Sequence, residues 1–282
     1  MKRWVAGGLL ALSAWTASAG PSGAHKAVEA SMLVTGWIEV APDGSVHGYT
    51  IDQPEKLPQT VINLIKKDVP AWKFRFDEPA AAIQRTPMHM RIKATPVDDK
   101  HDVIAISDAS FGDLSGNDTD SISSKARQPI KYPREAVEAG VAGTVYMIIR
   151  VNRQGKVEDI AAEQVDLHVR IREAQMRYFR DMLAKAAIES AKNWTFNLPT
   201  TGKHAADPYW NVAVPVSFNF GPPHMSDDAD YGKWDIYVPG PRQPVPWMTA
   251  DAQNAISPNT IPAGSISQAE SSLHLTTPLG GA

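Results

Sequence analysis

The residue types most able to do chemistry lack the spacing that catalysis or metal binding requires. The eight histidines form no H-E-x-x-H motif and no i, i+4 pair, so the signature of a zinc hydrolase is absent. His89 stands between Met88 and Met90 in a segment with strand character, and we expect it on the strand surface, because no second ligand stands at a suitable spacing. There are no cysteines, which excludes disulfides, cysteine-based zinc sites and thiol catalysis.

Two acidic clusters have oxygen atoms that suit a cation. The run Asp98-Asp99-Lys100-His101-Asp102 is typical of a solvated charged turn. The run from Asp113 to Asp120 alternates oxygen ligands, but its glycine is fourth rather than sixth and no glutamate follows at the twelfth position. It therefore departs from the calcium-loop pattern, and we expect no metal and no cofactor.

The remaining motifs favour binding over catalysis. The chain contains no G-x-S-x-G, no Walker loop and no G-x-G-x-x-G, so we expect that it is not an enzyme. Its 282 residues have 28 basic and 31 acidic side chains with no basic stripe, which argues against nucleic acid as a partner. Arg170, Arg172, Arg177 and Arg180 form either a solvated helix face or a surface for an acidic partner.

The N-terminus has the three regions of an export signal. A basic start, Met1 to Arg3, precedes an uncharged stretch from Trp4 to Trp15 and the A-x-A sequence Ala17-Ser18-Ala19. As a helix the uncharged stretch would rise about 18 Å, short of the ~30 Å hydrocarbon core. We expect residues 1–19 to be a signal peptide, so that the mature protein works in soluble form outside the cytoplasm. The alternative is an uncleaved anchor in the inner membrane.

The pattern of the segment 128–221 indicates a short helix, a hairpin, a long helix and a closing strand. Pro133 suits a first helical turn and Gly140 a helix end, while Gly155 suits the hairpin turn. Apolar residues at steps of three and four mark the long helix, and alternation marks the closing strand. These elements are expected at 132–140, 144–151 with 156–165, 173–194 and 211–220.

The segment 28–97 repeats this order. A hairpin with Gly44 in its turn leads to a helix at 58–69, and Ala71-Trp72-Lys73-Phe74 parallels Asn193-Trp194-Thr195-Phe196. We therefore predict an α+β fold of two tandem modules, each a small antiparallel sheet packed on helices, related by internal duplication. A linker is expected at 98–127 and a flexible Pro/Ser-rich tail at 222–282.

The second module resembles the C-terminal domain of the TonB family over about residues 127–220, roughly a third of the chain. The first module resembles it only from its hairpin onward, as a degenerate copy. The matching positions run through three stretches: Pro129-x-x-Tyr132-Pro133-x-x-Ala136-x-x-x-Gly140-x-x-Gly143-x-Val145, Ala191-x-x-Trp194-x-Phe196-x-x-Pro199 and Val214-Pro215-Val216-x-Phe218.

The resemblance implies that an extended segment of an outer-membrane transporter adds to a sheet edge, which is β-augmentation. We take the strand 211–220 as this edge. Pro215 suits an edge either because a partner pairs there or because it blocks aggregation. The expected partner-binding residues are Asn211, Val212, Val214, Pro215, Val216 and Phe218, and the expected core anchors are Trp72, Phe74, Trp194, Phe196, Tyr132 and Pro133.

The leading hypothesis is a periplasmic TonB-like protein that binds an outer-membrane receptor or another envelope protein in TonB-dependent transport. Transducers of this family resemble one another in a membrane anchor and a Pro-, Lys- and Glu-rich spacer, and neither is visible here. One alternative is therefore a structural or adaptor envelope protein without transducing activity. The other is a membrane-anchored energy transducer, with membrane contact only if the N-terminal segment is retained.

Overall fold

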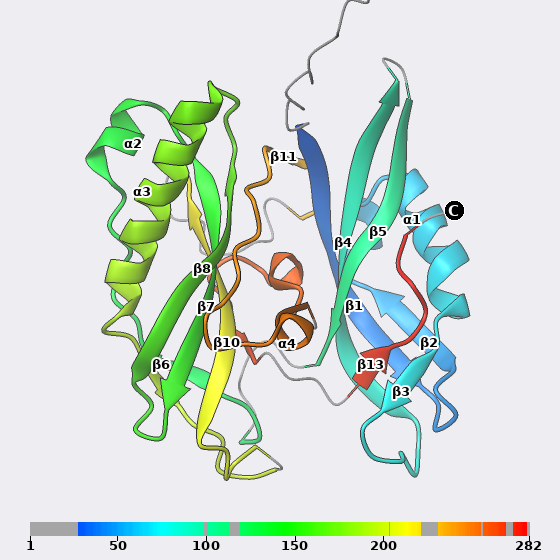
Figure 1. Cartoon of the computed structure of the whole chain (residues 1–282). Helices are drawn as coiled ribbons and strands as arrows, with labels where there is room; N and C mark the ends of the chain where they lie inside the picture. Colours follow the sequence, from blue (N-terminus) through cyan, green and yellow to red (C-terminus); the bar gives the residue numbers. More distant parts are fainter. Residues whose placement is uncertain are drawn as a thin grey trace, which may run out of the picture.

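A computed structural model describes residues 28–98, 101–112, 119–202, 204–220, 231–254, 256–268 and 273–280. Two antiparallel sheets face each other, helices lie on their outer sides, and the C-terminal part of the chain runs between them (Figure 1). The α+β class with antiparallel sheets is as the sequence predicts. The expected signal peptide, 1–19, lies outside the described residues. Among the helices that are described, none has the length and apolar character to cross a membrane.

The first sheet is built around the long strand β1, which pairs with β2, β4 and β11. Its order is β11-β1-β4-β5, and β2 pairs with the C-terminal half of β1. Alternate residues of β1 and β4 are apolar, and this face packs on α1 through Val61 and Ile65. The strands are β1 (Glu29–Val40), β2 (Val46–Ile51), β4 (Gln84–Asp98), β5 (His101–Phe111) and β11 (Asp235–Tyr237), and the helices are η1 (Pro54–Lys56), α1 (Gln59–Asp68) and η2 (Val69–Ala71).

The second sheet has the order β12-β10-β7-β8. One face of β7 and β10 packs on the long helix α3, and the short helix α2 lies at the start of the module. The strands are β7 (Gly143–Asn152), β8 (Val157–Leu167), β10 (Tyr209–Phe218) and β12 (Ser267–Gln268), and the helices are α2 (Arg134–Glu138) and α3 (Glu173–Ala191).

The two modules share topology and local detail. In the first module a hairpin, β1-β2, is joined by β4 at β1, and in the second the hairpin β7-β8 is joined by β10 at β7. A short strand follows each tryptophan: β3 (Phe74–Phe76) pairs with β13 (Leu273–Leu275), and β9 (Thr195–Asn197) pairs with β6 (Ser123–Ala126). Each short strand donates one backbone N–H at 2.8 Å to the turn glycine of its hairpin.

The C-terminal segment, which we define as residues 231–280, is a structural layer, in contrast to the flexible tail expected at 222–282. It supplies a strand to each sheet and one to β3, and its helices are α4 (Ala250–Asn254) and η4 (Pro258–Thr260). Its apolar residues have no regular period because each enters a site formed by other elements, so no sequence pattern reveals them. The buried ones are Val238, Val245, Ile256, Ile261, Ile266 and Leu273.

The segment 98–127, expected as a linker, also contains regular structure. β5 pairs with β4 from Met88 to Asp98, and β6 pairs with β9. The Asp-, Ser- and Gly-rich part on which the linker was based runs from Asp108 to Asp120; its first residues, Asp108 to Phe111, belong to β5, and 113–118 lie outside the described residues. The apolar alternation at Ile104 and Ile106 was the available signal for a strand.

Candidate docking edge on the second sheet

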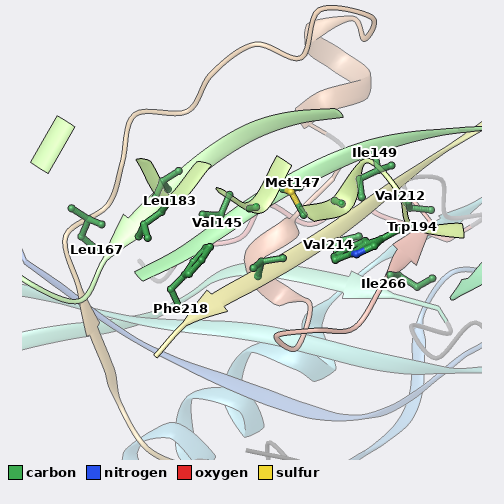
Figure 2. Packing of buried hydrophobic residues seen from close by; sticks show 14 of the residues in the cluster. Val145, Met147, Ile149, Leu167, Leu183, Trp194, Val212, Val214, Phe218 and Ile266 are labelled. Carbon is green, nitrogen blue, oxygen red and sulfur yellow. The ribbon is translucent and has the colours of Figure 1, made fainter. Parts of the chain in front are cut away.

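The strand expected to bind a partner, β10, is buried on both of its faces. Val212, Val214, Val216 and Phe218 belong to the core under α3. Figure 2 shows Val212, Val214 and Phe218 there with Leu183 and Met147. On the opposite face, Ala213 packs against Val245, Ile256 and Ile261 of the C-terminal segment. The side chains of β10 are therefore used for internal packing, and its backbone edge is what a partner can reach.

One backbone edge of β10 is fully paired. β7 runs antiparallel to it without a bulge, from Tyr209 opposite Asn152 to Phe218 opposite Gly143. The carbonyl of Pro215 turns the other way, because it accepts the N–H of Gly264 at 3.0 Å. Backbone groups of a strand alternate in direction, so Ala213 and Ser217 also face this outer edge. The close Thr144 Oγ1–Ser217 Oγ contact of 3.2 Å fits a pair whose backbone groups point away from each other.

The outer edge of β10 is partly covered by the chain itself. β12 pairs antiparallel with Val212 and Ala213, and within the described ranges no strand pairs with the edge from Val214 to Phe218. The N-terminal half of β10 therefore lies between β12 and β7, and its C-terminal half is the edge of the sheet. Pro215 lies at the junction and directs its ring, which has no N–H to donate, to the outer side.

A cleft of about 900 Å³ opens between the two sheets beside the start of β10. Tyr209 and Asn211 of β10 line one wall, Phe111 of β5 and Leu275 of β13 line the other, and Trp247 contributes its ring. Trp247 Nε1 donates to Asn211 Oδ1 at 3.0 Å, which accounts for the side chain of this predicted site residue. The lining combines apolar side chains with groups that can hydrogen-bond.

The aromatic anchors lie where each helix returns to its sheet. Trp72 and Phe74 are buried in the first core, and Trp194 and Phe196 are buried in the second. Tyr132 and Pro133 are half-buried just before α2. The hydroxyl of Tyr132 donates to the carbonyl of Val141 at 2.7 Å and its ring packs edge-on against Phe218, so it ties the start of the module to the end of β10.

Buried charges hold the C-terminal segment on the second sheet. Glu163, only 1% exposed, accepts Arg242 Nε at 2.5 Å and Gln253 Nε2 at 2.8 Å. Arg180, only 5% exposed, donates to the carbonyls of Val165, Val238 and Pro239. Burial lowers the pKa of Arg180 from its ordinary value.

Arg180 is one of four arginines for which the sequence left a solvated or partner-binding face open. Arg170, Arg172 and Arg177 are exposed, as both interpretations expected, and Arg180 is buried. Arg180 stands four residues after Met176 and three before Leu183, which was an ambiguous signal, since long charged side chains also occur at such positions on exposed faces.

The acidic clusters give no cation site among the described residues. No group of three or more His, Cys, Asp or Glu side chains that could hold a metal occurs there. Asp99 and Lys100 of the first cluster and residues 113–118 of the second lie outside the described ranges. His89 is half-buried on β4, opposite Ser110 of β5.

The hairpin, the helix ending in Trp-x-Phe and the closing strand define the class: part of this chain is a TonB C-terminal-like domain. Over 98 residues the chain is 38% identical to Protein TonB in each of two strains of Xanthomonas campestris pv. campestris, one of them strain B100. The match covers 34% of this chain and 37% of each relative, so the chain spans just over a third of the length of the curated relatives that it matches. No family model matches the chain. No solved structure matches it.

Proposed function

We propose that the protein is a TonB-like envelope protein of the periplasm that binds an extended segment of an outer-membrane transporter, or of another envelope protein, by strand addition at the outer edge of β10. The similarity to Protein TonB over 98 residues supports the class and the kind of partner. The observation that carries the proposal is the stretch from Val214 to Phe218, with whose outer edge no strand pairs within the described residues, although the carbonyl of Pro215 accepts the N–H of Gly264.

The edge has the properties that strand addition needs. Main-chain groups supply the affinity in this mode of recognition, so an edge whose side chains are already packed is still competent. Val212, Val214 and Phe218 anchor the strand in the core, which keeps the ordering entropy that binding must overcome small. Asn211 at the start of the strand lines the cleft and is the predicted site residue best placed to touch a partner's side chain.

We also propose that the two modules arose by tandem duplication and that residues 1–19 act as an export signal. The shared β2-β1-β4 and β8-β7-β10 topologies and the equivalent turn glycines support the first point. A periplasmic location agrees with such a signal and with the proposed TonB-like function. Mass spectrometry of the native N-terminus tests the signal, because a mature chain that begins at Gly20 contradicts an anchored transducer.

A structural or adaptor role is the second candidate. It is favoured because surfaces that a partner could bind are covered by the chain itself: β5 pairs with the edge of β4, and the C-terminal segment occupies the region between the sheets. In this role the edge of β10 would bind another envelope protein permanently and would take no part in transport. Failure of transporter segments to bind, together with a stable full-length fold, favours this role.

Binding is tested with synthetic periplasmic segments of outer-membrane transporters from the same organism, titrated into the full chain by calorimetry and followed by NMR shifts of 211–218. Ser217→Pro removes an outward N–H and should weaken binding by about tenfold, the value of one hydrogen bond. Ser217→Ala keeps that N–H and is the matched control. Equal binding by both variants contradicts β10 as the docking edge.

A further inference from the structure

We infer that residues 264–268 are the chain's own occupant of the β10 edge, and that a partner binds by replacing them with a segment that has an aliphatic residue at the position of Ile266. This inference rests on the proposed function and specifies both the partner's chemistry and the regulation of its site. The residues involved are Gly264, Ser265, Ile266, Ser267 and Gln268.

The backbone of this segment makes the contacts that an added strand would make. Ser267 and Gln268 are the Cα partners of Ala213 and Val212 in antiparallel register. Gly264 donates its N–H to Pro215 at 3.0 Å, beyond the point where the regular pairing ends. The segment therefore already uses the outward groups of β10 at 213 and 215, and a partner strand long enough to be stable must compete for the same groups.

Ile266 supplies the side-chain part of the contact. It is 4% exposed and belongs to the core under α3, where it lies in the same cluster as Trp194 and Val212 (Figure 2). Its neighbours Ser265 and Ser267 are only half-buried. The site thus takes a polar–aliphatic–polar triplet, and a charged residue in the middle would leave an unpaired charge among apolar atoms.

Arg127 holds the same segment from the other side. Its guanidinium donates to the carbonyl of Gly264 and lies over the ring of Trp194 at 5.3 Å. Because Trp194 belongs to the core of the second module, Arg127 stays at the edge when the segment leaves. It can then donate to a carbonyl of the incoming strand, so the exchange leaves no new unpaired group.

The first module shows the difference between a permanent and a replaceable occupant. The edge of β4 is topologically equivalent to that of β10, and β5 pairs with it from Met88 to Asp98, directly after β4 in the chain. In the second module the occupant has a two-residue strand that arrives from the C-terminal segment. Few ladder hydrogen bonds and one buried side chain make local opening far less costly there than at β5.

A disulfide lock tests the inference on the full chain, which has no cysteine of its own. Ala213→Cys with Ser267→Cys places two thiols on Cα partners, whose spacing of about 5.5 Å in an antiparallel pair suits a disulfide. The probe is a fluorescent peptide with the sequence of residues 262–268. We expect the reduced protein to bind the probe and the oxidised protein to bind it at least about tenfold more weakly. Equal binding in both states, or binding in neither, overturns the inference.

A second variant tests the side-chain requirement. Ile266→Asp should loosen the internal segment, so its affinity for the probe should exceed that of the unaltered chain by more than about tenfold, because the intramolecular competitor acts at roughly millimolar effective concentration. A probe with aspartate at the isoleucine position should bind neither protein. If this charged probe binds Ile266→Asp as well as the isoleucine probe does, the aliphatic requirement is wrong.

The outcome separates this inference from the proposed function. If the probe behaves as expected while transporter segments fail to bind Ile266→Asp, the segment is replaceable and the transporter partner is wrong. If transporter segments bind the oxidised lock as tightly as the reduced protein, the docking function stands and the replacement of 264–268 is wrong.

Discussion

At the scale of single residues, Gly155 and Phe196 show how closely the hairpin turn of the second module approaches the strand that follows α3. A Cβ at Gly155 would lie 2.3 Å from the carbonyl oxygen of Phe196, and the φ of Gly155 is +69°. Gly44 meets Phe74 in the same way in the first module, at 2.1 Å with a φ of +79°. In both modules the turn glycine is therefore needed for its lack of a side chain and for its conformation.

Gly155→Ala should destabilise the protein by at least about 2 kcal/mol, because it combines a left-handed backbone with a contact against backbone atoms that cannot move aside. Urea denaturation measures the change. Gly140→Ala is the control: Gly140 has a φ of +66°, but a Cβ there would have nothing within 4 Å. It should cost only about 1 kcal/mol. Equal losses for the two variants contradict the steric argument.

Arg242→Met should destabilise the full chain by about 3 kcal/mol, because it leaves the carboxylate of Glu163 buried without its cationic partner. Arg134→Met is the matched control, since the Arg134–Glu138 pair is exposed on both sides and should be worth less than about 0.5 kcal/mol. Thermal and urea unfolding measure both. A loss for Arg242→Met no larger than for the control means that the buried pair does not hold the C-terminal segment.

At the scale of elements, α3 and β10 form the framework that keeps the proposed docking edge straight. Leu183 on α3 is fully buried and packs where Gly143 of β7 has no side chain; a Cβ there would lie 3.3 Å from Leu183 Cδ1. The paired β7 holds the other edge of β10 through its whole length. A partner would thus meet a strand whose shape is set before binding.

Leu183→Ala should cost about 2–5 kcal/mol, as expected for a large-to-small change in a filled core. Arg177→Ala changes an exposed residue of the same helix and should alter stability by no more than about 0.5 kcal/mol. Chemical denaturation compares the two. If Leu183→Ala is as stable as Arg177→Ala, α3 does not carry the packing that we assign to it.

At the scale of the whole molecule, the C-terminal segment joins the two sheets by contacts to both. Arg91 of β4 donates through Nε to the carbonyl of Asn259 at 2.6 Å, and Asn259 in turn donates to Asp108 of β5 at 2.8 Å. Arg242 of the same segment pairs with Glu163 of β8. Removal of these contacts should separate the modules rather than unfold each one.

Alkaline pH tests the contact between the C-terminal segment and the first sheet through Tyr237, which lies on β11 beside β1. Burial is the main cause that raises the pKa of Tyr237 to about 12, from an ordinary value of 10.0. The folded state keeps this proton longer than the unfolded chain, so the free energy of unfolding should be unaffected below pH 10 and fall as pH rises from 10 to 12. Burial also raises the pKa of Tyr146, which contributes in the same direction.

Tyr237→Phe should reduce this alkaline loss of stability, while Tyr146 retains its own share. Denaturant titrations of both proteins at several pH values measure the slopes. A slope that is identical in the two proteins contradicts the assignment to Tyr237. Small-angle scattering over the same pH range shows whether the modules move apart before either one unfolds.

Local patterns in the sequence were sufficient for the main helices and the hairpins of both modules. The helices at 59–68 and 173–191 and the hairpins with Gly44 and Gly155 follow from periodicity and turn chemistry, which act over a few residues. The TonB-like class also follows from residues within one module. The sequence did not reveal the strand at 101–111, because its acidic surroundings resemble those of a linker.

Residues 129–218 by themselves determined the α+β module and its closing strand, because short-range sterics and hydrophobic periodicity decide where helices and strands form. Only the tertiary structure decided what lies beside that strand. Ile266 and Arg242 belong to an irregular Pro/Ser-rich sequence, yet they are buried or paired because other elements supply their sites. Such contacts join residues distant along the chain, so no periodic pattern in the sequence predicts them.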